Sequence, residues 1–429
     1  MDLMPSKQYG WGKGSVPEIA PHSLAKHRIL REYIQRYVEV LTTTPGMEVF
    51  RITLVDGFAG GGEYSDARTG LLCPGSPQIL IDAVRAAEVK VNATRSKPLK
   101  VDARYIFVEK DPAVAASLGE VLRKRGDAPT SNGPLHLLRG SFEENVDGII
   151  AAIKSRGRAH RAIFVLDQYG YTGVPVSTLT RIFEALPHAE VFLTLAVGWI
   201  TAYLPNARTA AQRLGLSAEM IARLCSTPDD ALDVEDPERR PDLHAIQRIL
   251  QHAFTTEVGA RFYTPFFIVS RESNRPYWFL HMANSARAND VVKALHWEVE
   301  NHFQHFGGPG LMMLGYDPSA DPDLTRQTTF RFDIDAKTRT RAALAMGLPS
   351  RLATTHPEGI AFDDLFLKVC NETPATRELL ATSISDLCVA GELEKRGGDG
   401  ERRAPTTLPH GDDLVRVARQ GILRFQGGG

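Results

Sequence analysis

The chain has few cysteines, and neither its cysteines nor its histidines have the spacing of a disulfide-rich or metal-binding protein. Its 429 residues include four cysteines, Cys73, Cys225, Cys370 and Cys388, and no two of them form a C-x-x-C pair. This spacing predicts neither a disulfide framework nor a zinc site, and we expect reduced thiols. The thirteen histidines form no H-x-H or H-E-x-x-H group, so no metal site is predicted either.

Long apolar runs and a large net charge are also missing. No run of about 18 apolar residues is present to cross a bilayer, and the polar start of the chain has no apolar signal core. We therefore expect a cytoplasmic protein with no membrane role. The net charge is −1, so the surface as a whole does not attract a phosphate backbone, and any nucleic-acid affinity requires a local patch.

What is present is the composition of an ordinary folded protein. Hydrophobic residues make up 43% of the chain and charged residues 24%, which excludes a disordered chain. The length allows one large domain and a smaller one. We expect an irregular segment over 1–22, a large domain over 23–340 with a helical insertion or lid at 206–245, and a small domain over 341–425.

Apolar runs and amphipathic segments alternate through the large domain. A helix is expected over Ser23–Leu41, and further helices over Pro112–Arg125 and Phe142–Arg156. Strands are expected over Arg51–Asp56, Ala103–Glu109, Leu135–Arg139 and Arg161–Asp167, then a helix and strand within Val176–Ala196, and closing strands over Arg261–Arg271 and Tyr277–Ala283. Such alternation predicts an α/β fold with a doubly wound, Rossmann-like parallel sheet.

The first two strands are separated by a long segment that we interpret as an insertion. It is basic, with Arg68, Lys90, Arg95, Lys97 and Lys100. The segment could guide a phosphate backbone, or it could simply be a solvated charged face.

The end of the chain has a different pattern. Phe362–Cys370 and Thr376–Ala390 are expected to be helices, followed by a hairpin with a glycine-rich tip in "ELEKRGGDGERRAPTTL". Two helices and a ribbon resemble a winged helix-turn-helix, a fold used for duplex recognition and for protein contacts. Acidic residues balance the cations of the hairpin, so both roles stay open.

The first strand leads directly into a glycine-rich turn, "GFAGGGEY". Glycines allow the backbone to approach a ligand at the carboxyl end of a strand. Asp56 ends this strand, and Glu109 ends the next, where its carboxylate could accept hydrogen bonds from ribose hydroxyls. An NAD-dependent oxidoreductase is a remote alternative, because its acid follows the glycines by about 20 residues. A turn-capping Asp56 and a solvated Glu109 are the structural alternatives.

In combination these motifs resemble the three-Cys-motif partner family, bacterial proteins similar to class I S-adenosylmethionine-dependent methyltransferases. The likeness extends from about Lys26 to Phe306. Its parts are the helix with Lys26, Tyr33 and Tyr37, the turn "DGFAGGGEY", "GSP" at Gly75–Pro77, "FVEKD" at Phe107–Asp111 and "LDQYG" at Leu166–Gly170.

The resemblance implies an S-adenosylmethionine site and, as a partner, a radical-S-adenosylmethionine protein that carries the three-cysteine cluster. The residues implied around the cofactor are Asp56, Gly57, Phe58, Ala59, Gly60, Gly75, Ser76, Glu109, Lys110 and Ser141.

The fourth strand supplies the candidate reacting site, "DQYGY". Amino-methyltransferases carry an acid or Asn, two prolines and an aromatic residue at this place. Asp167 and the carbonyl of Gln168 could accept the hydrogens of an exocyclic amine, and Tyr169 or Tyr171 could stack on the base. Here Gln168 and Tyr169 replace the prolines, which leaves a less rigid turn. Asp167 could instead simply end the strand.

Two functions are therefore open. The first is a methyltransferase that acts on a nucleobase in DNA or RNA. The second is a non-catalytic partner of the radical protein that uses its terminal domain to dock protein or nucleic acid.

Overall fold

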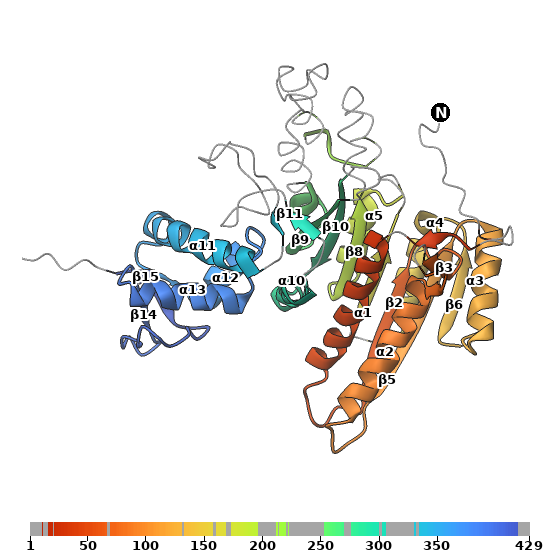
Figure 1. The fold of residues 1–429 in the computed structure, drawn as a ribbon, viewed down its shortest axis with the longest axis horizontal. Helices are drawn as coiled ribbons and strands as arrows, with labels where there is room; N and C mark the ends of the chain where they lie inside the picture. The colour runs from red at the N-terminus through yellow and green to blue at the C-terminus, as the bar shows by residue number, and fades with distance from the viewer. Residues whose placement is uncertain are drawn as a thin grey trace, which may run out of the picture. The chain divides into compact units, whose positions relative to one another are not determined.

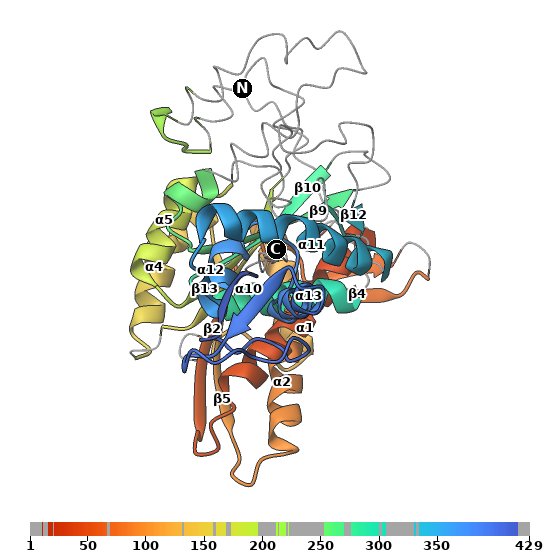
Figure 2. The same cartoon turned by 90° about the vertical axis from the view of Figure 1, so that its left-hand side faces the viewer.

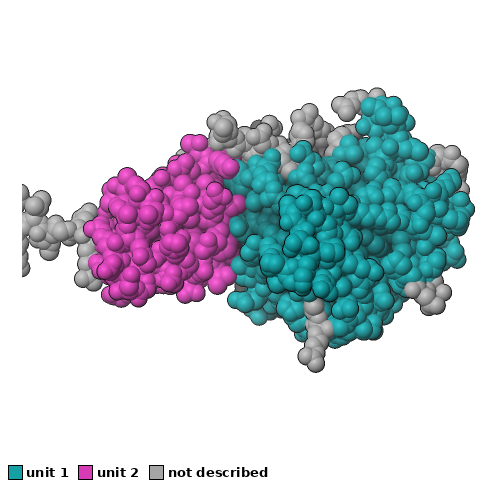
Figure 3. All heavy atoms as spheres, turned by 90° about the horizontal axis from the view of Figure 1, so that it is seen from below, with its two compact units in different colours: residues 1–305 teal, residues 306–429 magenta. Residues whose placement is uncertain are grey.

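The protein is described from a computed structural model. The described residues are 11, 16–19, 21–66, 69–130, 133–157, 160–168, 173–195, 212, 214–219, 222, 253–269, 276–299, 303–305, 330–331 and 334–418. The chain divides into two compact units, Met1–His305 and Phe306–Gly429, which Figure 3 colours separately. Most of the expected lid at 206–245 lies outside the described residues.

A large sheet forms the centre of unit 1. Its strands in chain order are β2 (Val49–Asp56), β5 (Lys100–Glu109), β6 (Leu135–Arg139), β7 (Ala162–Leu166), β8 (Ala189–Leu195), β9 (Phe262–Val269), β10 (Pro276–Ala283) and β11 (Phe303–His305). They lie in the spatial order β6-β5-β2-β7-β8-β10-β9-β11. The strands from β6 to β8 are parallel, and β10 runs antiparallel to both of its neighbours.

Helices accompany this sheet in the part of unit 1 that the structure describes (Figures 1 and 2). They are α1 (Pro21–Leu41), α2 (Ser76–Asn92), α3 (Pro112–Lys124), α4 (Phe142–Lys154), α5 (Val176–Ala185) and α10 (Ala286–Val299). The chain first moves outward from β2 to β6 and then returns to β7 and β8. Because such crossovers are right-handed, α2 and α3 cover one face and α4 and α5 cover the other. Helix α1 packs against both α2 and α10.

The segment between the first two strands of the sheet is not an insertion. It contains a hairpin, β3 (Glu63–Asp66) and β4 (Leu72–Pro74), and then α2, which is the first crossover helix. The short strand β1 (Glu18–Ile19) pairs with β3, so the N-terminal segment is not wholly irregular.

Two of the basic residues of this segment have internal partners. Lys90 forms an ion pair with Glu39, 2.6 Å between Nζ and Oε1. The Arg95 guanidinium donates to the carbonyls of Thr42 and Met47, each at 2.6 Å. These contacts account for Lys90 and Arg95 without a phosphate ligand. Arg68 lies outside the described residues.

The strand order identifies the fold class. Numbered along the chain from β2 to β10, the seven strands lie in the order 3-2-1-4-5-7-6, with the seventh antiparallel. The first five follow the doubly wound pattern. An antiparallel seventh strand between the fifth and the sixth is the arrangement of class I methyltransferases. The predicted doubly wound, methyltransferase-like sheet is thus confirmed.

Unit 2 contains β12 (Phe330–Arg331), α11 (Ile334–Thr355), β13 (Ile360–Ala361), α12 (Phe362–Val369), α13 (Arg377–Val389), β14 (Leu393–Arg396) and β15 (Leu414–Val417). Three of its strands form an antiparallel sheet in the order β13-β15-β14. Its core includes Leu365, Phe366, Leu380 and Ile384, all almost fully buried. Helix α11 begins before the expected boundary at 341. The winged-helix assignment remains a prediction.

Candidate functional site

Three acids reach the same edge of the sheet. Asp56 ends β2, which is paired in parallel with β5 on one side and β7 on the other. The register places Asp56 opposite Phe107 of β5 and Val165 of β7. Glu109 and Asp167 each follow the partner of Asp56 by two residues. They therefore lie on either side of Asp56 at the carboxyl ends of the strands, where open α/β sheets bind their ligands.

Glu109 holds the glycine turn. Its Oε2 accepts a hydrogen bond from the Gly60 amide, and its Oε1 accepts one from the Asp111 amide, both at 2.9 Å. Gly60 has φ +63°, a left-handed conformation that favours glycine. The half-buried carboxylate is thereby fixed at the end of β5 beside the turn.

The other glycines of the expected site serve close packing. A Cβ atom on Gly57 would lie 2.6 Å from Leu166 Cδ2 and 2.9 Å from Phe142 Cδ2. The Gly75 amide donates to the Gly62 carbonyl at 2.7 Å, which joins the start of α2 to the turn. The Ala59 amide donates in turn to the Val108 carbonyl at 3.0 Å. These contacts hold the turn in shape, so its backbone is already ordered.

The Trp11 side chain covers this turn from outside the sheet. It is buried, and it is the nearest group to the Cβ positions of Gly60 and Gly61. Its indole N–H donates to the Glu63 carbonyl at 2.7 Å. The N-terminal segment thus contributes one wall beside the glycine turn.

Asp56 is the most perturbed acid of the site. Its side chain has no solvent exposure, and burial raises its pKa to about 7 against the opposing effect of the Ser76 hydroxyl and the Phe58 amide. Oδ1 accepts from the Phe58 amide at 3.1 Å, while Oδ2 is buried with no well-aligned hydrogen bond to a described residue. A buried oxygen with no well-aligned donor among the described residues can accept a hydrogen bond from an amine of a ligand.

Asp167 is bound by a lysine from the first helix. Lys26 Nζ lies 2.6 Å from each carboxylate oxygen of Asp167. Burial opposes ionisation of Asp167, but the Lys26 charge and its hydrogen bond are stronger together and lower the Asp167 pKa below its ordinary value. The Lys26 side chain is nearly buried, whereas that of Asp167 is 34% exposed. Asp167 is therefore an ionised acceptor that a ligand can still reach.

A small cavity adjoins this pair. Lys26, His27, Ser76, Asp167 and Thr194 are among the residues that line it. Burial, together with the neighbouring Lys26 charge, lowers the His27 pKa to about 4, so the imidazole is neutral at physiological pH. The polar groups of the cavity come from α1, α2 and two strands, which only the fold brings together.

Gln168 holds the chain that follows the reacting strand. Its side-chain oxygen accepts hydrogen bonds from the Gly173 amide at 2.8 Å and the Val174 amide at 3.0 Å, and the residue is buried. The side chain is thus a positioning group within the protein. Tyr169 and Tyr171, the two candidates for the stacking residue, both lie outside the described residues.

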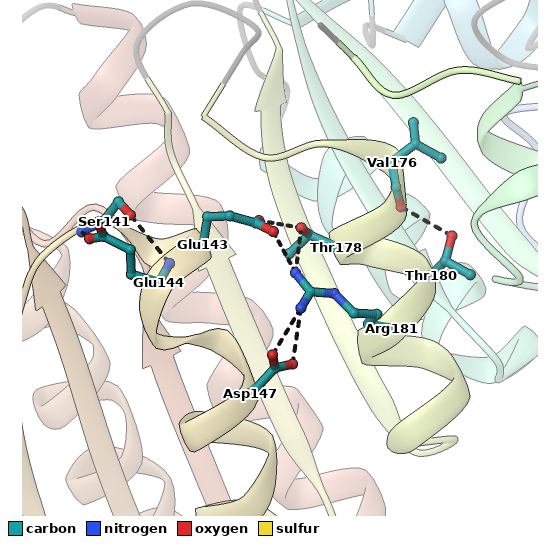
Figure 4. Close-up of polar contacts among 8 residues, drawn as sticks. All are labelled: Ser141, Glu143, Glu144, Asp147, Val176, Thr178, Thr180 and Arg181. Atoms are coloured by element: carbon teal, nitrogen blue, oxygen red, sulfur yellow. Dashed lines mark hydrogen bonds and ion pairs between the residues drawn. The ribbon is translucent and has the colours of Figure 1, made fainter. Parts of the chain in front are cut away.

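Ser141 and Lys110 are more peripheral. Ser141 caps α4: its hydroxyl accepts from the Glu144 amide at 3.2 Å, and the Glu144 carboxylate accepts from the Ser141 amide at 2.7 Å (Figure 4). Lys110 is exposed. The capping contact explains Ser141 without a ligand, and a cofactor contact from either residue remains a prediction.

Figure 4 also shows how α4 is held against α5 next to this cap. Arg181 of α5 forms ion pairs with Asp147, at 3.0 Å, and with Glu143, at 2.5 Å. The Thr178 hydroxyl donates to Glu143 as well. These contacts hold α4 and α5 together on this face of the sheet.

The sequence motifs named most of these residues but not their connections. Lys26 is part of the helix motif, which assigns it no role, and His27 is not part of any motif. The 141 positions that separate Lys26 from Asp167 hide the ion pair from any local pattern. The available signal is a lysine on the buried, apolar face of an amphipathic helix.

No family model and no curated protein sequence matches the chain. Among solved structures, a Legionella pneumophila protein of family DUF519 has 10% identity and a TM-score of 0.36, covering 64% of this chain and 91% of its own. A proposed caffeoyl-CoA O-methyltransferase from Staphylococcus aureus has 8% identity and a TM-score of 0.28, with 62% and 86% covered. A proposed zinc-dependent alcohol dehydrogenase from Rhodobacter sphaeroides has 12% identity and a TM-score of 0.23, with 57% and 88% covered.

Likenesses this weak carry no argument about function. The fold class rests on the strand order, and membership of the three-Cys-motif partner family stays a prediction. Within the described ranges, no helix has the length and apolar character to cross a membrane. The same ranges contain no group of three or more His, Cys, Asp or Glu residues arranged to hold a metal ion.

Proposed function

We propose that the protein binds S-adenosylmethionine at the carboxyl edge of β2 and β5 and transfers its methyl group to an exocyclic amine of a nucleobase. The observation that carries this proposal is the meeting of three acids, Asp56, Glu109 and Asp167, beside an ordered glycine turn. Asp56 and Glu109 would bind the cofactor, and Asp167 would bind the methyl acceptor.

The first two acids serve the cofactor. Glu109 would accept hydrogen bonds from the ribose hydroxyls, since it ends β5 and is already oriented by the turn. Asp56, whose buried Oδ2 makes no well-aligned hydrogen bond to a described residue, would accept one from the methionine amine. A cationic amine and a sulfonium centre nearby would favour the ionised form of Asp56 and so lower its pKa.

Asp167 would serve the acceptor. Lys26 keeps the Asp167 carboxylate ionised, so it can accept an N–H of the target amine. In the transfer, the amine nitrogen forms a bond to the methyl carbon while the carbon–sulfur bond breaks, and the amine then loses a proton to solvent. Positioning provides most of the acceleration in such a step. Gln168 would help by holding residues 173–174.

The contacts of unit 2 favour protein docking over DNA binding. Glu394 accepts from Arg396 at 3.3 Å and pairs with Arg416, and Arg403 lies 3.3 Å from Asp413. Lys395 is buried, with Nζ 3.0 Å from the Pro405 carbonyl. Cations paired in this way attract phosphate weakly. We propose that unit 2 is a winged helix that docks a protein, which suits the second function, a partner of a radical-S-adenosylmethionine protein.

The test measures methyl transfer to nucleic acid. Purified protein is incubated with methyl-labelled S-adenosylmethionine and with DNA or RNA, and methylated bases are identified by mass spectrometry. The proposal expects a labelled N-methyl base with the native protein and at least a tenfold loss with Asp167→Asn, which removes the charge with little change in shape. Cofactor binding without any labelled base, together with capture of a three-cysteine radical protein, would instead support the non-catalytic function.

A further inference from the structure

A second cavity lies at the opposite edge of the same sheet. Its walls come from the starts of β7 and β8, the end of β10, and the helices α1 and α10. The volume is about 250 Å³, which is close to the lower end of the range for small-molecule pockets, roughly 300–1,000 Å³. The cavity therefore suits a metabolite rather than a macromolecule.

An acid forms part of the cavity wall. Glu190 lies on β8, whose residues are all buried, and its own exposure is 5%. The Tyr33 hydroxyl donates to Glu190 Oε2, and His281 Nε2 lies 3.0 Å from the same oxygen. Both contacts end on Oε2, so among the described residues the other oxygen, Oε1, can still accept a hydrogen bond from a ligand. A carboxylate in an apolar strand costs stability, which is a reason to look for a use of Glu190 beyond packing.

Cations and apolar groups make up other parts of the wall. Arg161 and Arg287 both line the cavity, and neither forms an ion pair with a described residue. Arg161 lies over the Phe50 ring, 5.4 Å from its centroid, which leaves its N–H groups to bind elsewhere. The Tyr37 ring, Leu41 and Val291 add flat and apolar surface. The wall therefore offers an acceptor, two fork-shaped donors and a surface for a ring.

We propose that this cavity binds a small organic anion built on a flat ring that carries an N–H or O–H donor. The ring donor would bind Glu190, and the phosphate or carboxylate would bind Arg161 and Arg287, whose guanidinium groups match both anions. Nucleoside monophosphates and phenolic carboxylates share this chemistry. The site is independent of the proposed methyl-donor site, since it lies at the amino ends of the parallel strands.

The experiment is a calorimetric titration of the full chain with adenosine monophosphate, 4-hydroxybenzoate and inorganic phosphate. We expect one of the two ring compounds to bind, and phosphate alone to bind at least about tenfold more weakly. Arg287→Ala should raise the dissociation constant of the ring compound that binds by at least about tenfold. Arg287 is exposed, so this variant should fold normally. Arg123→Ala, an exposed arginine of α3 outside the cavity, is the matched control and should bind as the native protein does.

Two further variants separate this site from the methyl-donor site. Glu190→Gln should reduce binding of the ring compound, with folding checked by circular dichroism, while Glu109→Ala should leave it unchanged. Loss of binding in Glu109→Ala would place the compound at the methyl-donor edge and overturn the proposal. So would equal affinities of Arg287→Ala and Arg123→Ala, or no binding of either ring compound at millimolar concentration.

Discussion

Lys26 Nζ lies 2.6 Å from both carboxylate oxygens of Asp167, and this contact joins the first helix to the end of the fourth parallel strand. The ammonium is nearly buried, so it would be costly to leave without its partner. The pair thus stabilises the fold and at the same time fixes the charge of the candidate reacting acid.

Replacement of Lys26 should therefore destabilise the protein. Lys26→Met leaves the Asp167 carboxylate without its cation, and we expect a loss of about 1–3 kcal/mol in the free energy of unfolding. This is below the value for a fully buried pair, because water reaches Asp167. Urea unfolding measures the change, with Lys110→Met as the exposed control. The double variant Lys26→Met, Asp167→Asn should recover part of the loss, and no recovery would argue against a coupled pair.

The buried Asp56 should make stability depend on pH. Its folded-state pKa, about 7, is higher than the ordinary value for an unfolded chain. Between about pH 4 and 7 the folded protein keeps a proton that the unfolded chain releases, so Asp56 lowers the free energy of unfolding as pH rises. His27, with its pKa lowered to about 4, has the opposite effect over nearly the same range.

The difference between native protein and Asp56→Asn isolates the contribution of Asp56. From pH 5 to pH 8 the native protein should lose about 2–3 kcal/mol of unfolding free energy relative to the variant, measured in urea. Parallel pH curves for the two proteins would show that Asp56 titrates near its ordinary pKa in the folded state.

Two glycines of unit 1 should respond to alanine in opposite directions. Gly57→Ala places a Cβ atom 2.6 Å from Leu166 Cδ2 and should destabilise by about 1–3 kcal/mol through overpacking. Gly148 lies within α4 with open space at its Cβ position, and Gly148→Ala should stabilise by about 0.5–1 kcal/mol. Thermal unfolding of both variants checks the pair, and a neutral Gly57→Ala would mean that the turn has room for a side chain.

Local sequence patterns predicted the repeating part of the fold well. The expected strand Leu135–Arg139 has the observed bounds, and the closing strand expected over Tyr277–Ala283 differs by one residue. These segments are apolar runs between clear turns, so burial and local preference indicate the same structure. The sequence indicates the places of Asp56 and Glu109 for a related reason, since each is the last residue of a parallel strand.

Helix α2 was missed although its signals are present. Gly75 is followed by Pro77 in the first turn, and the Gln78 side chain accepts from the Gly75 amide, a typical helix start. Ile79 and Ala83 then continue the apolar face. The hairpin β3–β4 separates α2 from the glycine turn, so the helix does not directly follow the first strand and its turn as in a simple βαβ unit.

Other features depend on tertiary structure that no local pattern specifies. Glu190 stands in the strand "AEVFLTL" as the one charged residue, and only the packing of α1 brings Tyr33 to it. The Lys26 and Asp167 contact has the same origin. In both cases the sequence shows a charged residue among apolar ones, but it does not show the partner, which lies far away in the chain.

The central claim concerns the acids beside the glycine turn, and a calorimetric titration with S-adenosylmethionine tests it most directly. The native protein should bind, and Glu109→Ala should bind at least about tenfold more weakly through loss of the ribose contacts. Glu120→Ala, an exposed glutamate of α3, should bind as the native protein does. No binding of S-adenosylmethionine by the native protein at millimolar concentration, or equal binding by Glu109→Ala, would contradict the account.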